Sequence, residues 1–268
     1  MINSSAMKLY YQHFPDHLSI DQFAHNVPVI IIHGLFGSTA NWRSFARKLA
    51  VTRPVIVVDL RNHGRSPHAD SNTYVDMVAD LIELCDQLAI DKAVFCGHSM
   101  GGKVGMLLAH KHPQRVERLL VLDIAPVKYQ HSHAPFLQGL MNIDLSVLKS
   151  RSEADRALRN VITDTPTRLF LLQSLTGSPG NYKWRINIPV LYEFMETIMD
   201  FPEQTTRFDA PTLFLHGELS NYVLQEHRAK IEQMFSHPQF QSIEGAGHWL
   251  HAEQPDLVLL AVREFIDS

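Results

Sequence analysis

A serine between two glycines is the residue of this sequence whose surroundings most clearly suggest chemistry. Ser99 lies in the pentapeptide Gly97-His98-Ser99-Met100-Gly101, which follows an apolar run and opens a helical pattern. A G-x-S-x-G sequence between a strand and a helix forms a tight turn that lifts the serine hydroxyl above the strand, where it can act as a nucleophile. Such a turn needs neighbours with almost no side chain, and Gly97 and Gly101 meet this need. The start of the following helix favours developing negative charge.

Two other roles of this segment compete with the nucleophile. Serine is a common N-cap residue, and its side chain would then only hold the first turn of the helix. Residues 97–103 also match the phosphate-binding pattern G-x-x-x-x-G-K, but Val104 stands where that loop needs Ser or Thr to hold Mg²⁺. The preceding strand and the partner residues described next favour the nucleophile.

A nucleophilic serine needs a base, and 16 histidines compete for that role. His248 has the most suitable position, because it follows a predicted strand ending at Ser242-Ile243-Glu244 and the turn Gly245-Ala246-Gly247, and precedes a helical segment. His251 is expected to lie on the surface of that helix or behind the catalytic group. No pair of histidines has a convincing third ligand, so the sequence predicts no metal site, and no cofactor is expected.

The acid that orients the histidine is harder to find. Many enzymes with this arrangement carry an aspartate three residues after the glycine that ends the next-to-last strand, and Ser220 holds that position here. Asp123 ends a strand that neighbours the nucleophile strand, and we expect its carboxylate to reach the far nitrogen of His248. A cap of the following loop is the structural alternative for Asp123. Glu218 is the rival acid, because its longer side chain would compensate for its earlier position.

A second glycine loop, His33-Gly34-Leu35-Phe36-Gly37, also follows an apolar run. An H-G-x-x-G loop supplies one backbone N–H to an oxyanion, and the residue after the nucleophile supplies the other. We assign these two donors to Leu35 and Met100. Phe36 and Trp184 are expected to line an acyl pocket, with packing inside a helical cap as the alternative for Trp184.

The elements that must position these residues alternate between strands and helices. Apolar, β-branched runs predict strands at 29–32, 55–58, 93–96, 119–122 and 212–215. Helical spacing predicts helices over 41–50, 74–88, 100–111, 223–235 and 256–266. The strands are apolar at nearly every position, as in strands covered on both faces. The sequence therefore predicts an α/β fold with a mostly parallel central sheet and helices on both faces.

The pattern changes between residues 127 and 207, where apolar residues recur at helical spacing and no clear strand-like run appears. We predict a helical cap in this segment, inserted between the two parts of the core, residues 1–126 and residues 208–268. Long insertions over the edge of a sheet usually shape a binding site.

The composition argues against several classes of protein. The 268 residues suit one large domain, and the net charge of −4 without a dense Lys/Arg run argues against nucleic-acid binding. No apolar run approaches the length of a membrane span, and the N-terminus lacks a signal-peptide pattern. With only two cysteines, a reducing compartment is expected, and we predict a cytoplasmic protein.

Taken together, these segments resemble the α/β-hydrolases of the YbfF-type esterase group. The likeness lies in residues 33–38, 59–66, 97–103, 122–126 and 247–249, and in Lys183-Trp184-Arg185-Ile186-Asn187 of the predicted cap. It covers nearly the whole chain from about Ala6. The resemblance implies the α/β-hydrolase fold, hydrolysis of short or medium acyl esters and acyl-CoA thioesters, and a catalytic acid at Asp123.

The hypothesis from the sequence is a Ser-His-Asp hydrolase that forms an acyl-enzyme on a small-molecule ester or thioester, with neither a nucleic acid nor a membrane as partner. C–C bond hydrolysis and perhydrolysis by the same triad are alternatives, because a fold does not fix a reaction. Haloalkane dehalogenation is disfavoured, since the nucleophile is Ser99 and not an aspartate. A protein that keeps the pocket and binds a ligand without turnover is an alternative of another class.

Overall fold

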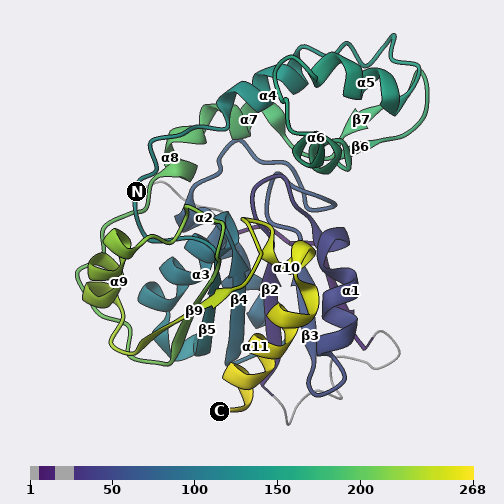
Figure 1. Ribbon diagram of the computed structural model, residues 1–268. Coiled ribbons are helices and arrows are strands. Elements are labelled where there is room, and N and C mark those ends of the chain that lie inside the picture. Colours follow the sequence, from purple (N-terminus) through teal and green to yellow (C-terminus); the bar gives the residue numbers. More distant parts are fainter. Residues whose placement is uncertain (1–5, 16–26) are drawn as a thin grey trace.

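A seven-stranded sheet forms the centre of the molecule (Figure 1). The computed structural model describes residues 6–15 and 27–268, so the first residues, on which the location prediction partly rests, lie outside the described part. The strands are β1 (Tyr11–Phe14), β2 (Val29–Ile32), β3 (Val55–Val58), β4 (Ala93–His98), β5 (Val116–Leu122), β8 (Thr212–Gly217) and β9 (Pro238–Ile243). Their order is β1-β3-β2-β4-β5-β8-β9. Only the β1–β3 pair is antiparallel among these described strands, which confirms the mostly parallel sheet.

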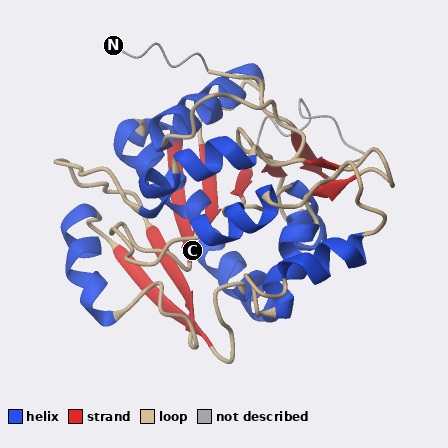
Figure 2. Ribbon diagram, turned by 90° about the horizontal axis from the view of Figure 1, so that it is seen from above, coloured by secondary structure: helices blue, strands red, loops and turns tan. Residues whose placement is uncertain are grey.

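Helices cover both faces of this sheet (Figures 1 and 2). The core helices are α1 (Thr39–Leu49), α2 (Tyr74–Gln87), α3 (Met100–Lys111), α9 (Arg228–Met234), α10 (Leu250–Glu253) and α11 (Pro255–Asp267). Along β2, Ile30 and Ile32 join the apolar cluster under α2, α3 and α9, while Val29 and Ile31 join the cluster under α1 and α11. This alternation explains why the strand is apolar at every position.

The strand order reverses direction at β2, and this reversal places the site. The chain passes from β2 to β3 on one side and returns to β4 on the other side. The loops that leave the carboxyl ends of β2 and β4 therefore diverge around a common crevice, which is the usual ligand-binding position of an open α/β sheet. Both glycine loops of the sequence leave the sheet here.

Between β5 and β8 the chain leaves the sheet and forms a separate group of short elements. They are α4 (Ala134–Met141), α5 (Arg151–Leu158), α6 (Thr165–Leu172), β6 (Leu175–Thr176), β7 (Lys183–Trp184), α7 (Ile188–Glu193) and α8 (Met195–Met199). In Figure 1 most of them lie above the sheet. We use the word cap for residues 127–207. The antiparallel β6–β7 pair was not expected, because strands of two residues carry no periodic signal.

One element was missed, and one predicted helix begins later than expected. The strand β1 was not predicted, since four residues of mixed polarity at the sheet edge give no apolar run. The helix predicted over residues 223–235 begins later, as a 3₁₀ turn at Gln225–His227 followed by α9. Within the predicted segment, the Leu224 N–H donates to His227 Nδ1 (3.2 Å), a local side-chain bond of the kind that competes with helix formation.

None of the helices within residues 6–15 and 27–268 is long and apolar enough to span a membrane.

Candidate active site

Ser99 occupies a strained turn between β4 and α3. Its backbone angles are φ 52° and ψ −120°, and its side chain makes no capping hydrogen bond, which removes the N-cap alternative. A Cβ atom at Gly97 would collide with the main chain of Gly101, and one at Gly101 would collide with the carbonyl oxygen of Ile32. The prediction that this turn requires glycines is therefore confirmed. A non-glycine residue at positive φ costs of order 1–3 kcal/mol and is found mostly at functional sites.

The structure brings Ser99, His248 and Asp123 together, although they come from three separate loops. The His248 Nε2 lies 3.1 Å from Ser99 Oγ, and its Nδ1 lies 2.7 Å from Asp123 Oδ2. Since a carboxylate only accepts hydrogen bonds, the proton of neutral His248 resides on Nδ1. The Nε2 lone pair then faces the serine hydroxyl, as a general base requires.

Asp123 is fully buried at the end of β5. Its carboxylate accepts hydrogen bonds from Ser220 Oγ (2.5 Å) and from the Gly217 N–H (3.1 Å). Burial raises the pKa of Asp123 to about 6, and these two bonds oppose that rise. Ser220 thus occupies the position where many such enzymes carry an aspartate. Its hydroxyl donates a hydrogen bond to Asp123, which lies at the end of the adjacent strand.

Two glutamates hold the loop that carries His248. Glu218 accepts a hydrogen bond from the Gly245 N–H (2.9 Å), and Glu253 accepts one from the Gly247 N–H (2.7 Å). Glu218 therefore binds loop backbone, while the Nδ1 of His248 is bound by Asp123. Burial lowers the pKa of His248, which keeps its imidazole neutral at neutral pH.

Two residues next to His248, His98 and Tyr222, were not singled out from the sequence, and the place of His251 was left open. His98 Nε2 donates to the carbonyl oxygen of His248 (2.8 Å). The Tyr222 ring stacks on the His248 imidazole, with centroids 3.9 Å apart and planes at 20°. His251 is sandwiched behind them, stacked on Trp42 at 4.0 Å and 4.7 Å from His98, so its predicted surface position is wrong and the position behind the catalytic group is right. The place of His98 inside the G-x-S-x-G sequence is a signal that could have found it.

The loop after β2 is shaped by His33. Its Nε2 accepts a hydrogen bond from the Leu60 N–H (3.0 Å), so its Nδ1 carries the proton that binds the Gly34 carbonyl oxygen (2.8 Å). Among the described residues, the backbone N–H groups of Leu35 and Met100 have no protein acceptor. Both remain available for an oxyanion at Ser99.

Two cavities meet at Ser99. Phe36, Phe136, Phe170 and His248 are among the residues that line the larger cavity. The smaller cavity is lined by Ser99 together with Leu35, Met100 and Tyr222. Trp184, expected to line a pocket, lines neither cavity. It pairs with Leu175 in the β6–β7 hairpin and packs against the apolar cluster, so the alternative of packing applies.

Comparison with known proteins agrees with this geometry. The family described as the alpha/beta hydrolase fold matches residues 27–255. The chain is 39% identical over 253 residues to the sn-1-specific diacylglycerol lipase ABHD11 of Danio rerio, which covers 90% of this chain and 80% of that protein. It is 37% identical over 244 residues to Esterase YbfF of Escherichia coli K12, covering 91% of this chain and 94% of that protein.

A solved structure of a marine microorganism esterase superimposes with a TM-score of 0.90 at 36% identity, covering 97% of this chain and all of that one. The observed fold, with one glycine loop after β2 and one after β4, is consistent with the family of these relatives. The chain belongs to the α/β-hydrolase family and, within it, to the esterase- and lipase-type hydrolases related to YbfF.

Proposed function

We propose that Ser99, His248 and Asp123 act as a catalytic triad that hydrolyses carboxylic esters through an acyl-enzyme. The observation that carries this proposal is the continuous chain of contacts from Asp123 Oδ2 to His248 Nδ1 and from His248 Nε2 to Ser99 Oγ. It is supported by the strained turn at Ser99 and by the two free N–H groups of Leu35 and Met100.

In the first half of the reaction, Ser99 Oγ bonds to the acyl carbon while its proton passes to His248 Nε2. The carbonyl oxygen becomes an oxyanion, which the N–H groups of Leu35 and Met100 stabilise. Asp123 stabilises the imidazolium. The bond to the leaving oxygen then breaks, and His248 gives its proton to the departing alcohol.

In the second half, His248 takes a proton from water as the water oxygen attacks the acyl carbon. The Ser99 Oγ–acyl bond breaks, the carboxylic acid leaves, and the proton returns to Ser99. The same steps cleave a thioester, with a thiol as the leaving group, so we include thioesters in the proposal. We also propose that residues 127–207 act as a cap domain on the core of residues 1–126 and 208–268, because Phe136 and Phe170 of this segment line the larger cavity.

The test compares hydrolysis of p-nitrophenyl butyrate by the wild type and by Ser99→Ala, Asp123→Asn and Glu218→Gln. Loss of the nucleophile is expected to lower kcat by roughly 10⁴-fold or more, as removal of a triad serine does. Asp123→Asn is expected to cost roughly 10⁴-fold, because the histidine then adopts the wrong tautomer. Glu218→Gln keeps an oxygen for the Gly245 N–H and is expected to remain within a few-fold of the wild type.

Turnover that survives in Ser99→Ala would disprove the nucleophile. A large loss of kcat in Glu218→Gln, together with a kcat near that of the wild type in Asp123→Asn, would assign the acid to Glu218. Absence of turnover across ester and acyl-CoA panels, together with tight ligand binding, would favour the non-catalytic alternative.

A further inference from the structure

Two segments that stand out in the sequence have no part in the proposed triad, and the structure joins them. They are residues 59–66, which follow β3, and residues 183–187 of the cap. The Asn187 N–H donates to the carbonyl oxygen of Asn62 (2.9 Å). The Asn187 Nδ2 donates to Asn62 Oδ1 (3.0 Å) and to the carbonyl oxygen of Ala69 (3.1 Å). Three hydrogen bonds therefore connect this part of the cap to the core.

Asn62 is held firmly at the point where the cap contacts it. It is fully buried and has a φ of 64°. Its Oδ1 also accepts a hydrogen bond from the Ala69 N–H (2.8 Å), and its Nδ2 donates to the Ser71 carbonyl oxygen (2.9 Å) and to Asn72 Oδ1 (3.1 Å). Both donors and both acceptor positions of the side-chain amide are thus in use. A displacement of Asn187 is therefore transmitted to the chain around Asn62.

Residues 59–66, which we call the clamp loop, hold both ends of residues 33–38, which we call the oxyanion loop. The Leu60 N–H donates to His33 Nε2 (3.0 Å), at the start of the oxyanion loop. Asp59 Oδ1 accepts a hydrogen bond from the Thr39 N–H (2.5 Å), directly after its end. Asp59 Oδ2 accepts one from the Arg65 N–H (2.7 Å), which closes the clamp loop on itself. The position of the clamp loop therefore determines that of the oxyanion loop.

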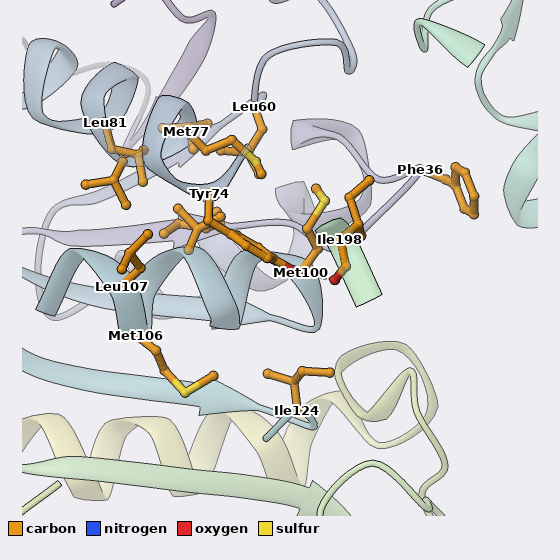
Figure 3. Packing of buried hydrophobic residues seen from close by; sticks show 14 of the residues in the cluster. Phe36, Leu60, Tyr74, Met77, Leu81, Met100, Met106, Leu107, Ile124 and Ile198 are labelled. Carbon is orange, nitrogen blue, oxygen red and sulfur yellow. Dashed lines mark hydrogen bonds between the residues drawn. The ribbon is translucent and has the colours of Figure 1, made fainter. Parts of the chain in front are cut away.

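The clamp loop is stiff enough to transmit a displacement. Leu60 is fully buried in the apolar cluster of the core, which Figure 3 shows together with Met77 and Leu81 of α2. At Gly64, which has a φ of 58°, a Cβ atom would collide with the carboxylate of Asp59. Closely packed segments of this kind have low compressibility and pass strain on to their neighbours.

We propose that Asn187 is a positioning residue for the oxyanion hole. Through Asn62 and the clamp loop it holds the oxyanion loop, so the Leu35 N–H is aimed at the oxyanion when the cap is in place. The proposal rests on the proposed triad and gives the cap a part in the chemical step. Such a donor must lie about 2.7–3.1 Å from the position of the oxyanion, so even a small displacement lowers the rate.

The experiment compares the wild type with Asn187→Ala, Asn187→Asp and a control, Asn181→Ala. Asn181 is an exposed asparagine of the same cap, in the turn between β6 and β7. Three quantities are measured: kcat and KM for p-nitrophenyl butyrate, the inhibition constant of butylboronic acid, and amide hydrogen exchange in residues 33–38. The boronic acid forms a tetrahedral adduct with a nucleophilic serine and places an oxygen in the oxyanion hole. Circular dichroism and Tm check that each variant is folded.

The two Asn187 variants differ in how strongly they disturb the contact. In Asn187→Ala, the Ala69 carbonyl oxygen loses the Asn187 side-chain donor, while Asn62 Oδ1 keeps the Ala69 N–H and the main-chain bond to Asn62 remains. Asn187→Asp keeps the size of the side chain but places a carboxylate oxygen against two acceptors. Its effect should therefore be the larger of the two.

For Asn187→Ala we expect kcat to fall by about tenfold, less than the roughly 10²–10³-fold that loss of an oxyanion donor costs. KM should stay within about twofold of the wild type, because the interaction is made in the transition state. The inhibition constant of butylboronic acid should rise by the same factor as kcat falls. Amide exchange should become faster in residues 33–38 and stay unchanged in β5. Asn181→Ala should match the wild type in all of these.

Three results would overturn this role of Asn187. A lower Tm with unchanged kcat and boronate affinity would mean that the residue only stabilises the cap. A rise of KM alone would mean that the cap shapes substrate binding and not the oxyanion hole. Exchange in residues 33–38 that is unchanged, or that rises equally in β5, would remove the connection through the clamp loop.

Failure of the proposed triad would look different. It would appear as turnover that survives in Ser99→Ala, or as a wild type that does not bind butylboronic acid. The exchange measurement needs no turnover, so it tests the connection between Asn187 and the oxyanion loop in either case.

Discussion

At the scale of single residues, Tyr222 connects His248 to Asp123. Its ring covers one face of the His248 imidazole at 3.9 Å. Its N–H donates to Ser220 Oγ (3.2 Å), and the Ser220 hydroxyl donates to Asp123. The Tyr222 hydroxyl lies 2.9 Å from His131 Nε2 in the cap. We therefore regard Tyr222 as a residue that positions His248, and it also lines the smaller cavity beside Ser99.

Replacement of this ring should change both the rate and the pH profile. Tyr222→Leu removes the stacked face and lets water reach the imidazole, so the lowered pKa of His248 should rise toward its ordinary value. Because the base must be neutral, the acid limb of kcat/KM should then move to higher pH. The value of kcat should fall by less than the roughly 10²–10⁴-fold that a general base contributes, since His248 itself is retained. Tyr222→Phe keeps the stacked ring, so its kcat and the position of its acid limb should stay near those of the wild type.

The measurement is kcat/KM for p-nitrophenyl butyrate between pH 4.5 and 8 for the three proteins. An acid limb that stays in place in Tyr222→Leu would show that the ring does not shield His248. Equal losses of kcat in Tyr222→Phe and Tyr222→Leu would mean that the effect comes from the Tyr222 hydroxyl and its contact with His131, and not from the ring.

At the scale of elements, the cap is joined to the nucleophile helix by one buried ammonium group. Lys103 of α3 is 1% exposed, and its Nζ donates to the carbonyl oxygens of Val127 (3.0 Å), Met199 (3.0 Å) and Asp200 (2.8 Å). Val127 begins the cap, and Met199 and Asp200 lie where α8 ends. The start of the cap and the end of α8 therefore meet at Lys103, the lysine that gave residues 97–103 their likeness to a phosphate-binding loop.

Loss of this ammonium group should loosen the cap. Lys103→Met removes this donor from the carbonyl oxygens of Val127 and Asp200, while that of Met199 keeps the Tyr129 N–H as its donor (3.0 Å). Each buried group that is left unsatisfied costs about 1–3 kcal/mol. We expect a lower Tm and faster limited proteolysis within residues 127–207. Lys111→Met is the control, an exposed lysine at the end of the same helix. Equal proteolysis rates in the two variants would contradict this role of Lys103.

The sequence predicted elements and residues well where a few consecutive residues share one environment, such as a buried strand or a tight turn. The strands β2 and β3 were found because every residue is buried, and Ser99 was found because its turn admits only glycine at two positions. The short pair β6–β7 left no such pattern. Ser220 and Asp123 are 97 residues apart in the chain, so no spacing could show that one hydrogen-bonds to the other.

Side-chain roles within the cap were the least predictable. Apolar residues that pack and apolar residues that line a pocket look alike in a sequence, and Trp184 shows the consequence. Its hairpin pairing with Leu175 keeps it from both cavities, whereas Phe136 and Phe170 of the neighbouring helices line the larger one. Which cap residue contacts a ligand depends on how α4 and α6 lie over the sheet, and that is a tertiary property.

At the scale of the whole molecule, many histidines are buried around the site in their neutral form. Burial lowers the pKa of His33 and His133 to about 4 and that of His63 and His98 to about 3. In the unfolded chain each titrates near pH 6.5. Below that pH the unfolded state binds protons that the folded state excludes, so acid favours unfolding. These histidines make stability depend on pH in a range where most proteins are near their optimum.

Stability should therefore fall as the pH falls from 7 to 5. Each of these histidines removes about 1.4 kcal/mol of stability per pH unit below 6.5, until its folded pKa is reached. Asp59, Asp80 and Asp123, whose pKa values burial raises, offset part of this loss because the folded state takes up their protons first. The histidines outnumber them, so Tm measured by circular dichroism should drop over this range in both the wild type and Ser99→Ala. A constant Tm between pH 7 and 5 would mean that these imidazoles are solvated or charged in the folded protein. The close packing of His33, His63, His98 and His133 around the site would then need another explanation.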